Sequence, residues 1–292
     1  MEILKYMAGI IDTEGCIRIS KEGTELLSIS MCDIEPIEVF QSYFGGNICK
    51  YEFTENENRS PIFQWKVVGE KLQQAKPLLP LLRLERKQQA LQLCFHHWET
   101  KDESLIQQLQ ELPRKVSATD YPKLPFSDLM ELFPYFAGVW DGDGCSTILK
   151  QREGFGETLP FLVLEMCDRE VIDYFGSLLG GHIRKSGRKE QANHSPSFRW
   201  ELQGRAVIPI AESLLQFMLI PRKRKALSCV LECAKLKSVR GRARHGVPFH
   251  ILKQRQALRD MCLLLNQRGA DKIDHSSIEI KTSNETQIWM KI

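Results

Sequence analysis

The sequence predicts an α+β protein built from two similar repeats, each with the element order αββαββα. The segments "YMAGIIDTEG" (6–15) and "YFAGVWDGDG" (135–144) match at a constant offset in the numbering. The triplet "MCD" at 31–33 recurs at 166–168, at a slightly larger offset that the following matches share. Between these marks, stretches of helical and of strand character follow one another in the same order in both halves. Constant offsets of this kind indicate two homologous halves.

The elements of the first half follow from apolar periodicity and from glycines. Apolar side chains recur at the helical period between residues 34 and 44, and the Gly45-Gly46 pair ends this helix. In chain order we expect a helix over 2–13, strands over 16–21 and 25–31, a helix over 34–44, strands over 47–53 and 61–68, and helices around 69–79 and 84–98. The second half repeats this pattern from 134 to about 236, with six residues inserted near 152–157.

These patterns divide the chain into four segments. Three prolines lie within fourteen residues at 113–126, which is typical of a linker. The part after 237 has no match in the first half and contains one expected helix, around 250–267. The expected organisation is a first repeat over 1–112, a linker over 113–126, a second repeat over 127–237 and a C-terminal extension over 238–292.

The bulk composition is that of an ordinary globular protein. Of the 292 residues, 42% are hydrophobic and 26% are charged, and no apolar run approaches the roughly 20 residues needed to cross a membrane. The N-terminal segment has no basic stretch followed by a clean apolar run, so we expect no secretory signal. Nine cysteines without paired CxxC spacing argue against a disulfide framework and a structural zinc site. We therefore expect a reducing intracellular location, either cytoplasmic (nucleoid) or within an organelle, and not secretion.

Charge is more informative in its distribution than in its net value of +3. Basic residues are dense in "PRKRK" (221–225) and "SVRGRARHG" (238–246). Clustered Lys and Arg displace counterions from phosphates, so these segments favour contact with nucleic acid over an ordinary solvated surface.

The repeated apolar helices carry glycine in their middle and acids at their ends. Gly9 and Gly138 would each cost about 1 kcal/mol relative to Ala in a helix, a cost that is understandable if the two helices touch backbone to backbone. Their C-terminal ends then lie side by side, and Glu14 converges on Asp143. Two carboxylates at negative helix ends require positive compensation, which a hard divalent cation such as Mg²⁺ supplies. Gly15 is expected to be a left-handed cap.

The segments "MAGIIDTEG" (7–15) and "FAGVWDGDG" (136–144) resemble the LAGLIDADG motif of homing endonucleases. Two motifs in one chain resemble the monomeric, two-repeat branch of that family. The resemblance implies two pseudo-symmetric repeats packed through their LAGLIDADG helices, with the sheets forming a saddle-shaped surface for double-stranded DNA. The eighth motif residue is the metal-binding acid in this family, which implies that Glu14 and Asp143 are catalytic residues and ligands of Mg²⁺ or Mn²⁺.

The activity implied is hydrolysis of one phosphodiester bond in each DNA strand, with metal ions activating water and stabilising the leaving oxygen. The family also uses a basic residue near each site. The segments "LERKQQAL" (84–91) and "IPRKRKAL" (220–227) align by their shared "AL", which makes Lys87 and Lys223 the candidates. Surface charge on a helix is the competing interpretation of both lysines.

Strand alternation predicts which side chains face DNA. Trp65 and Trp200 belong to the core pattern, so the residues that flank them point outward. The predicted DNA-facing residues of the first half are Arg18, Ser20, Ser28, Ser30, Tyr51, Gln64 and Lys66. Those of the second half are Thr147, Glu165, Arg184, Ser186, Arg188, Arg199 and Glu201. Because the outward residues differ between the halves, we expect a long, asymmetric target.

Three functions remain open at this point. The first is a site-specific double-strand endonuclease encoded within an intron and active in intron homing. The second is an RNA-splicing maturase, which would bind its host intron RNA through the basic segment 238–246. The third is a catalytically silent, sequence-specific DNA-binding protein, which both retained motif acids argue against.

Overall fold

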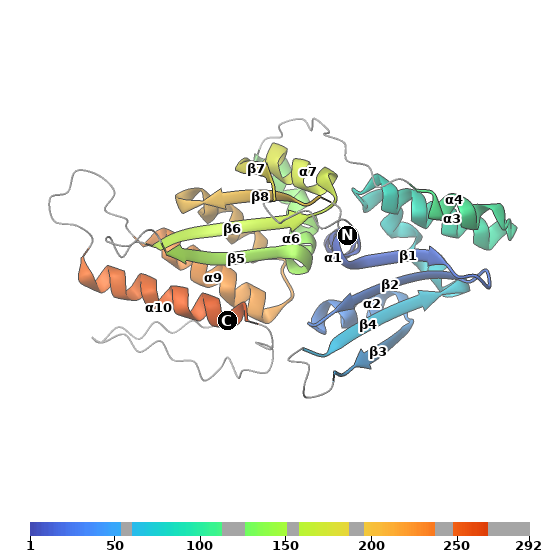
Figure 1. The fold of residues 1–292 in the computed structure, drawn as a ribbon, viewed down its shortest axis with the longest axis horizontal. Helices are drawn as coiled ribbons and strands as arrows, with labels where there is room; N and C mark the ends of the chain where they lie inside the picture. The colour runs from blue at the N-terminus through green and yellow to red at the C-terminus, as the bar shows by residue number, and fades with distance from the viewer. Residues whose placement is uncertain (54–59, 113–125, 151–157, 187–195, 237–247, 268–292) are drawn as a thin grey trace.

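The computed structural model describes residues 1–53, 60–112, 126–150, 158–186, 196–236 and 248–267 (Figure 1). The first half comprises α1 (Glu2–Glu14), β1 (Gly15–Ile19), β2 (Glu25–Met31), α2 (Glu35–Phe44), β3 (Asn47–Tyr51), β4 (Ile62–Val68), the 3₁₀ segment η1 (Gly69–Leu81), α3 (Glu85–Thr100) and α4 (Ser104–Gln110). The second half begins with α5 (Phe126–Leu129) and η2 (Met130–Leu132). It continues through α6 (Phe133–Asp143), β5 (Gly144–Lys150), β6 (Thr158–Met166), α7 (Arg169–Leu179), β7 (His182–Lys185), β8 (Phe198–Gln203), η3 (Gly204–Ala206), α8 (Val207–Leu214), α9 (Pro221–Lys235) and α10 (Phe249–Leu265).

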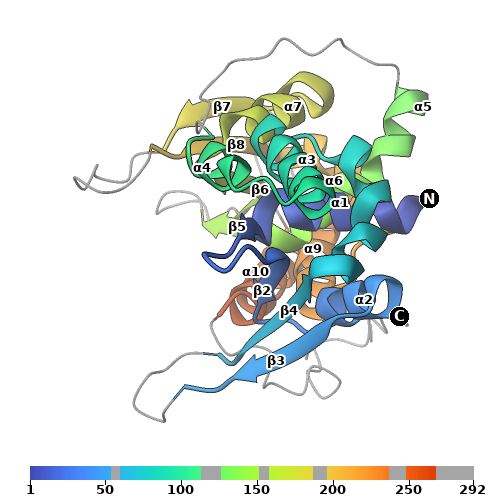
Figure 2. The ribbon, with the colours of Figure 1, turned by 90° about the vertical axis from the view of Figure 1, so that its right-hand side faces the viewer.

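The strands form two antiparallel sheets with the same topology. Their orders are β1-β2-β4-β3 and β5-β6-β8-β7, and Figure 2 shows β3 at the outer edge of the first sheet. Each half therefore pairs its strands in the same way, with Trp65 opposite Ile29 and Trp200 opposite Leu164. The repeat inferred from the sequence is confirmed as a structural repeat.

The two halves meet through α1 and α6, which lie between the sheets (Figure 1). Both mid-helix glycines are at the crossing. A Cβ added to Gly9 would collide with the backbone of Tyr135, and one added to Gly138 would collide with the backbone of Tyr6. The expected contact between backbones is confirmed, and a single hydrophobic core cluster extends through both halves.

One expected helix has a different type, and two expectations about local structure were wrong. The segment 69–81 is a 3₁₀ helix because Pro77 and Pro80 interrupt an α-helical ladder. Gly15 is extended, with φ −73° and ψ 133°, and is not a left-handed cap. A side chain there would strike the preceding helical turn at Ile11, which explains the need for glycine.

The second wrong expectation concerns the ends of the repeats. Helix α4 contacts α3 and β1 as α10 contacts α9 and β5, so the first half does have a counterpart of α10 and each repeat ends with a further helix. The expected linker lies outside the described residues apart from its last residue, Phe126, which begins α5.

Candidate active site at the paired helix ends

The buried acids Asp12 and Asp141 hold the two halves together. Asp12 Oδ2 accepts hydrogen bonds from the Tyr135 hydroxyl at 2.8 Å and from the backbone N–H groups of Arg83 (2.7 Å) and Leu84 (3.3 Å). Asp12 is fully buried, and its bonds satisfy amides at the start of α3, which helps to offset its position at the negative end of its own helix.

Asp141 makes the matching set of bonds in the second half. Its Oδ2 accepts from the Tyr6 hydroxyl at 2.8 Å and from the N–H groups of Leu219 (2.7 Å) and Ile220 (3.3 Å), at the start of α9. Burial raises the pKa of Asp12 and of Asp141 to about 6. A signal for this pair of Tyr–Asp bonds was present along the chain, since Tyr6 and Tyr135 recur at the same offset as the two aspartates.

The two candidate lysines neutralise the carbonyl ends of the helices. Lys87 Nζ donates to the carbonyls of Ile11 (2.6 Å) and Asp12 (2.9 Å). Lys223 Nζ donates to the carbonyls of Asp141 and Gly142, both at 2.7 Å. Cations at a helix C-terminus are stabilised by its partial negative charge.

The location of these lysines bears on both interpretations offered by the sequence. Lys87 is only 5% exposed, so the surface-charge interpretation is wrong for this residue. Burial lowers the pKa of each lysine, while the charges of Asp12 and Asp141 oppose that effect. A catalytic role for Lys87 and Lys223 stays a prediction.

Glu14 and Asp143 are the last residues of α1 and α6. Burial raises the pKa of Glu14, and the negative charge of Asp143 raises it further. Desolvation also raises the pKa of Asp143, although this residue keeps an exposed surface, and the charge of Lys223 opposes the shift. The two helix ends lie side by side, because a Cβ added to Gly142 would meet the Thr13 side chain. The role of Glu14 and Asp143 as metal ligands stays a prediction.

These two carboxylates fit a divalent cation of the magnesium type. Their mutual repulsion is relieved when a cation lies between them. No group of three or more His, Cys, Asp or Glu side chains is arranged to hold a metal ion in the part of the chain that the structure describes. One or two carboxylates suffice for Mg²⁺, which takes its remaining oxygens from water and from substrate phosphates.

Two ion pairs that sequence reasoning missed cross the boundary between the halves. Arg86 in α3 pairs with Asp168, with Nη2 at 3.2 and 3.1 Å from the two carboxylate oxygens. Arg222 in α9 pairs with Asp33 through two bonds of 2.7 and 2.6 Å. Both aspartates end the repeated "MCD" triplets, and both arginines directly precede a candidate lysine.

The predicted outward residues of the first half lie on one face of its sheet. Gln64 connects them, because its Nε2 donates to Ser30 Oγ at 3.0 Å while Tyr51 donates to its Oε1 at 3.3 Å. Arg18 is exposed and Lys66 is half-buried on the same face. Two placements differ from expectation. Ser28 is on this face but only 6% exposed, and Ser20 lies beyond the end of β1, where its Oγ accepts from the Thr24 N–H.

The matching face of the second half is charged. Glu165 accepts two bonds from Arg199, at 3.1 and 2.6 Å, and single bonds from Ser186 (2.8 Å) and Ser197. Glu201 accepts from Arg184. These contacts lower the pKa of Glu165 and raise that of Arg199.

Thr147 and Arg188 are the other two residues predicted for this face. Thr147 is half-buried on the same face, and Arg188 lies outside the described residues. The alternation that assigned the outward faces is therefore correct in every described strand that carries these residues. The sequence did not show that the glutamates are already bound to arginines.

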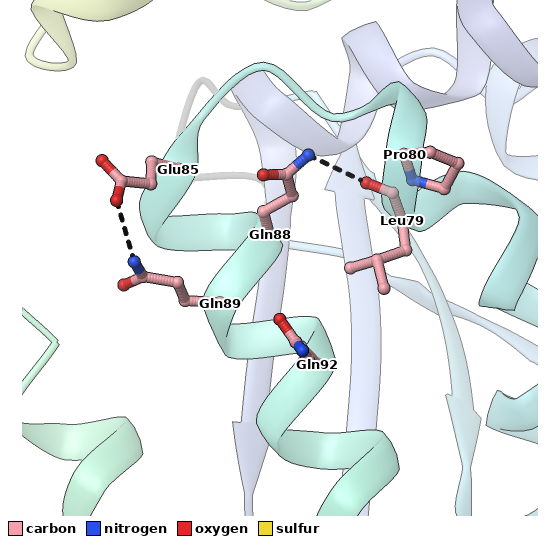
Figure 3. A pocket seen from close by; sticks show the side chains of 6 residues that line it. All are labelled: Leu79, Pro80, Glu85, Gln88, Gln89 and Gln92. Carbon is pink, nitrogen blue, oxygen red and sulfur yellow. Dashed lines mark hydrogen bonds between the residues drawn. The ribbon is translucent and has the colours of Figure 1, made fainter.

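One surface pocket is separate from these residues. Figure 3 shows six residues lining it on η1 and α3, where Gln88 donates to the Leu79 carbonyl and Gln89 donates to Glu85. The six are Leu79, Pro80, Glu85, Gln88, Gln89 and Gln92. It contains none of the predicted site residues.

Two further observations concern the chain as a whole. All nine cysteines are free thiols. Among the described helices, none is both long enough and apolar enough to cross a lipid bilayer.

Comparison with known proteins identifies the fold. No protein-family model matches the sequence, and no curated protein matches it. Among solved structures, I-SmaMI bound to an uncleaved DNA target with calcium ions is similar at a TM-score of 0.60 and 17% identity, covering 88% of this chain and 97% of that one. I-LtrWI, a LAGLIDADG homing endonuclease bound to target DNA, is similar at a TM-score of 0.60 and 14% identity, covering 91% and 98%.

A third similar structure is the LAGLIDADG meganuclease I-AabMI bound to uncleaved DNA. Its TM-score is 0.55 at 15% identity, and the match covers 80% of this chain and 90% of that one. The likeness therefore extends over both halves in all three cases. The chain has the two-repeat fold of the LAGLIDADG homing endonucleases.

Proposed function

We propose that this protein is a site-specific double-strand DNA endonuclease that hydrolyses phosphodiester bonds with the help of Mg²⁺ or Mn²⁺. The observation that carries the proposal is that α1 and α6 end side by side, with Glu14 and Asp143 as their last residues. Asp12 and Asp141, which lie two residues earlier, are used to hold the fold together. Glu14 and Asp143 have no comparable structural task among their described contacts, which supports a chemical one.

Each half supplies the groups for one DNA strand in this proposal. Glu14 and Asp143 would hold the divalent cations through their carboxylate oxygens, one acid from each half. The metal, when bound, supplies activation of a water molecule and stabilisation of the leaving oxygen. Lys87 and Lys223 fix the two helix ends through their carbonyls, and their positive charges act on both acids and favour the ionised carboxylates that metal binding requires.

The outer faces of the two sheets are the proposed DNA-binding surface. Arg18, Lys66 and Arg184 are suited to phosphates or base edges, and Gln64 and Arg199 to base edges in the major groove. Structures of I-SmaMI bound to uncleaved and to cleaved DNA have the same fold, which supports DNA as the partner. The unlike faces support an asymmetric target bound by a monomer with internal pseudo-two-fold symmetry. We further propose that the protein is encoded within an intron whose homing it promotes.

The first experiment is a cleavage assay with the full chain. Duplex DNA that spans the insertion site of the gene, with the insert removed, is incubated with the protein and Mg²⁺, Mn²⁺, Ca²⁺ or EDTA. We expect a double-strand break with Mg²⁺ or Mn²⁺ and none with EDTA. Glu14→Gln and Asp143→Asn should each reduce cleavage by about 1000-fold, equivalent to about 4 kcal/mol of transition-state stabilisation, while DNA binding persists.

The outcomes separate the three candidate functions. Tight DNA binding without cleavage by the wild-type protein, with every metal, would contradict the proposal and favour a silent DNA-binding protein. Absence of DNA binding together with binding to the host intron RNA would favour a maturase. Cleavage that both variants retain would show that the metal-binding acids lie elsewhere.

A further inference from the structure

The repeated "MCD" triplets place an aspartate of each half against an arginine of the other. Asp33, which lies before α2, pairs with Arg222 of the second half, and Asp168, which lies before α7, pairs with Arg86 of the first half. Each pair uses both oxygens of the carboxylate. Arg222 donates through Nε and Nη2, a bidentate arrangement that fixes direction as well as distance, whereas Arg86 donates to both oxygens through Nη2 alone.

The arginines lie in the first helical turn that also carries the candidate lysine. Arg86 and Lys87 follow Glu85, the first residue of α3. Arg222 and Lys223 follow Pro221, the first residue of α9. The lysines reach across to the carbonyl ends of α1 and α6, directly beside the two acids. The first turn of α3 and that of α9 each carry an arginine paired with an aspartate of the other half and, next to it, a lysine bonded to a helix end.

We propose that Asp33 and Asp168 are positioning residues, each of which holds the lysine-bearing turn of the opposite half against its acid-bearing helix end. This inference rests on the proposed function. Neither aspartate touches the reacting atoms in this account. Each half's site is then complete only when the other half is folded beside it, which would make cutting of the two strands interdependent through structure.

The two ion pairs, Arg222–Asp33 and Arg86–Asp168, differ in length and burial. The Arg222–Asp33 bonds are shorter, and Asp33 keeps only 8% of its side-chain surface exposed, against 22% for Asp168. In the first half, the Glu85 N–H also donates to Glu170 at 3.2 Å, which gives that turn a second tie across the boundary. Pro221, at the matching place in the second half, has no N–H to donate. We therefore expect Asp33→Asn to have the larger effect.

The test follows the two DNA strands separately. Each strand of a cleavable duplex carries its own label, and nicking rates are measured for the wild type, Asp33→Asn, Asp168→Asn, Lys87→Met and Lys223→Met. We expect Asp168→Asn to slow the same strand as Lys87→Met, and Asp33→Asn the same strand as Lys223→Met, each by about 10-fold on that strand. Asp33→Glu should recover part of the loss. Asp260→Asn removes an exposed carboxylate of α10 and serves as the control, with rates like those of the wild type.

A second readout does not depend on cleavage. Hydrogen exchange is followed by mass spectrometry in the metal-free protein. Asp168→Asn should raise exchange in peptides covering the end of α1 and the start of α3 while the end of α6 keeps its protection. Asp33→Asn should give the reverse pattern at α6 and α9.

The outcomes distinguish this inference from the proposed function. Equal slowing of both strands by each aspartate variant, or increased exchange at both helix ends, would show a general loss of packing and overturn the positioning role. If the wild type fails to cut DNA, the proposed function fails, while the exchange pattern still decides whether each aspartate holds one turn in place.

Discussion

Trp65 in the first sheet and Trp200 in the second are fully buried and make the same bond, whereas the outward residues beside them have different partners. The Trp65 indole N–H donates to the Gly45 carbonyl at 2.7 Å, and that of Trp200 to the Gly180 carbonyl at 2.5 Å. On the opposite face, Gln64 binds hydroxyl groups and Arg199 binds carboxylates. The inner faces of the two sheets therefore share the same tryptophan hydrogen bond, whereas the outer faces have different hydrogen-bond partners.

The difference between inner and outer faces shows which side of each sheet is constrained by packing. Inward residues pack against helices that both halves need, so a change there costs stability. For the sheet to fold, outward residues need only tolerate water and fit beside the neighbouring side chains. A neutral hydrogen-bonded face and a face of paired charges are both compatible with the same four-stranded sheet. Substituting matching residues in the two halves can therefore test how similar their contributions to stability and binding are.

The largest effect is expected at the shared crossing of α1 and α6. Gly9→Ala and Gly138→Ala each place a methyl group against the backbone of the other helix, so we expect each to lower the free energy of unfolding by about 3 kcal/mol. Denaturant titration measures the loss. Ser42→Ala, at an exposed helical position, is the control and should change stability by no more than about 0.5 kcal/mol. A large loss of stability for only one of the two glycine variants would show that the two helices do not contribute equally to the crossing.

The next prediction concerns pH and the matched acids Asp12 and Asp141. Burial raises both pKa values from 3.8 to about 6, so the folded protein binds these protons more tightly than the unfolded chain does. Their contribution to the free energy of unfolding therefore declines as pH rises from about 4 to about 6, by up to about 3 kcal/mol per residue, and is constant above.

Asp12→Asn and Asp141→Asn isolate that contribution. The amide oxygen can accept the same hydrogen bonds, but the amide does not titrate. Between pH 4 and pH 6, the free energy of unfolding of each variant should therefore rise relative to that of the wild type. Denaturant midpoints across this range measure the difference. Since Asp12 and Asp141 have matching partners, both variants should give the same curve, and a difference that stays flat with pH would contradict the assignment.

The smallest effect is expected where the halves differ. Under the proposed function, Arg199→Ala and Gln64→Ala should each relax discrimination at one base-pair position, by about 1–2 kcal/mol, at different places in the target. Stability should change little for Gln64→Ala and more for Arg199→Ala, because the latter removes the two bonds that Glu165 accepts from Arg199. Binding to a set of singly substituted duplexes provides the measurement. Unchanged preference at every position would show that these faces do not read the bases.

Much of this molecule could be predicted from the spacing of residues. The constant offsets between matching segments predicted the repeat, the glycines predicted the contact between α1 and α6, and alternation predicted the outer faces. Each depends on local period or on repetition, which are visible along the chain. Glu14 and Asp143 were located by the same repetition.

The missed features depend on contacts between segments far apart in the sequence. The bond between Asp33 and Arg222 joins positions 189 residues apart, and no local pattern specifies it. The lysines were found by alignment, but their bonds to the helix carbonyls depend on where α3 and α9 begin in space. The pairing of Glu165 with Arg199 likewise depends on strand register, which alternation alone does not fix.

The joining of both repeats in one chain has a consequence for how such a protein changes over generations. A homodimer built from one repeat would carry every substitution twice, so a new side chain on one sheet would appear on the other as well. Here Gln64 and Arg199 are separate codons, and either can mutate while the Tyr6–Asp141 and Tyr135–Asp12 bonds keep the halves in register. Under the proposed function, the two sheets can therefore come to match a target without palindromic symmetry while the bonds between the halves are kept.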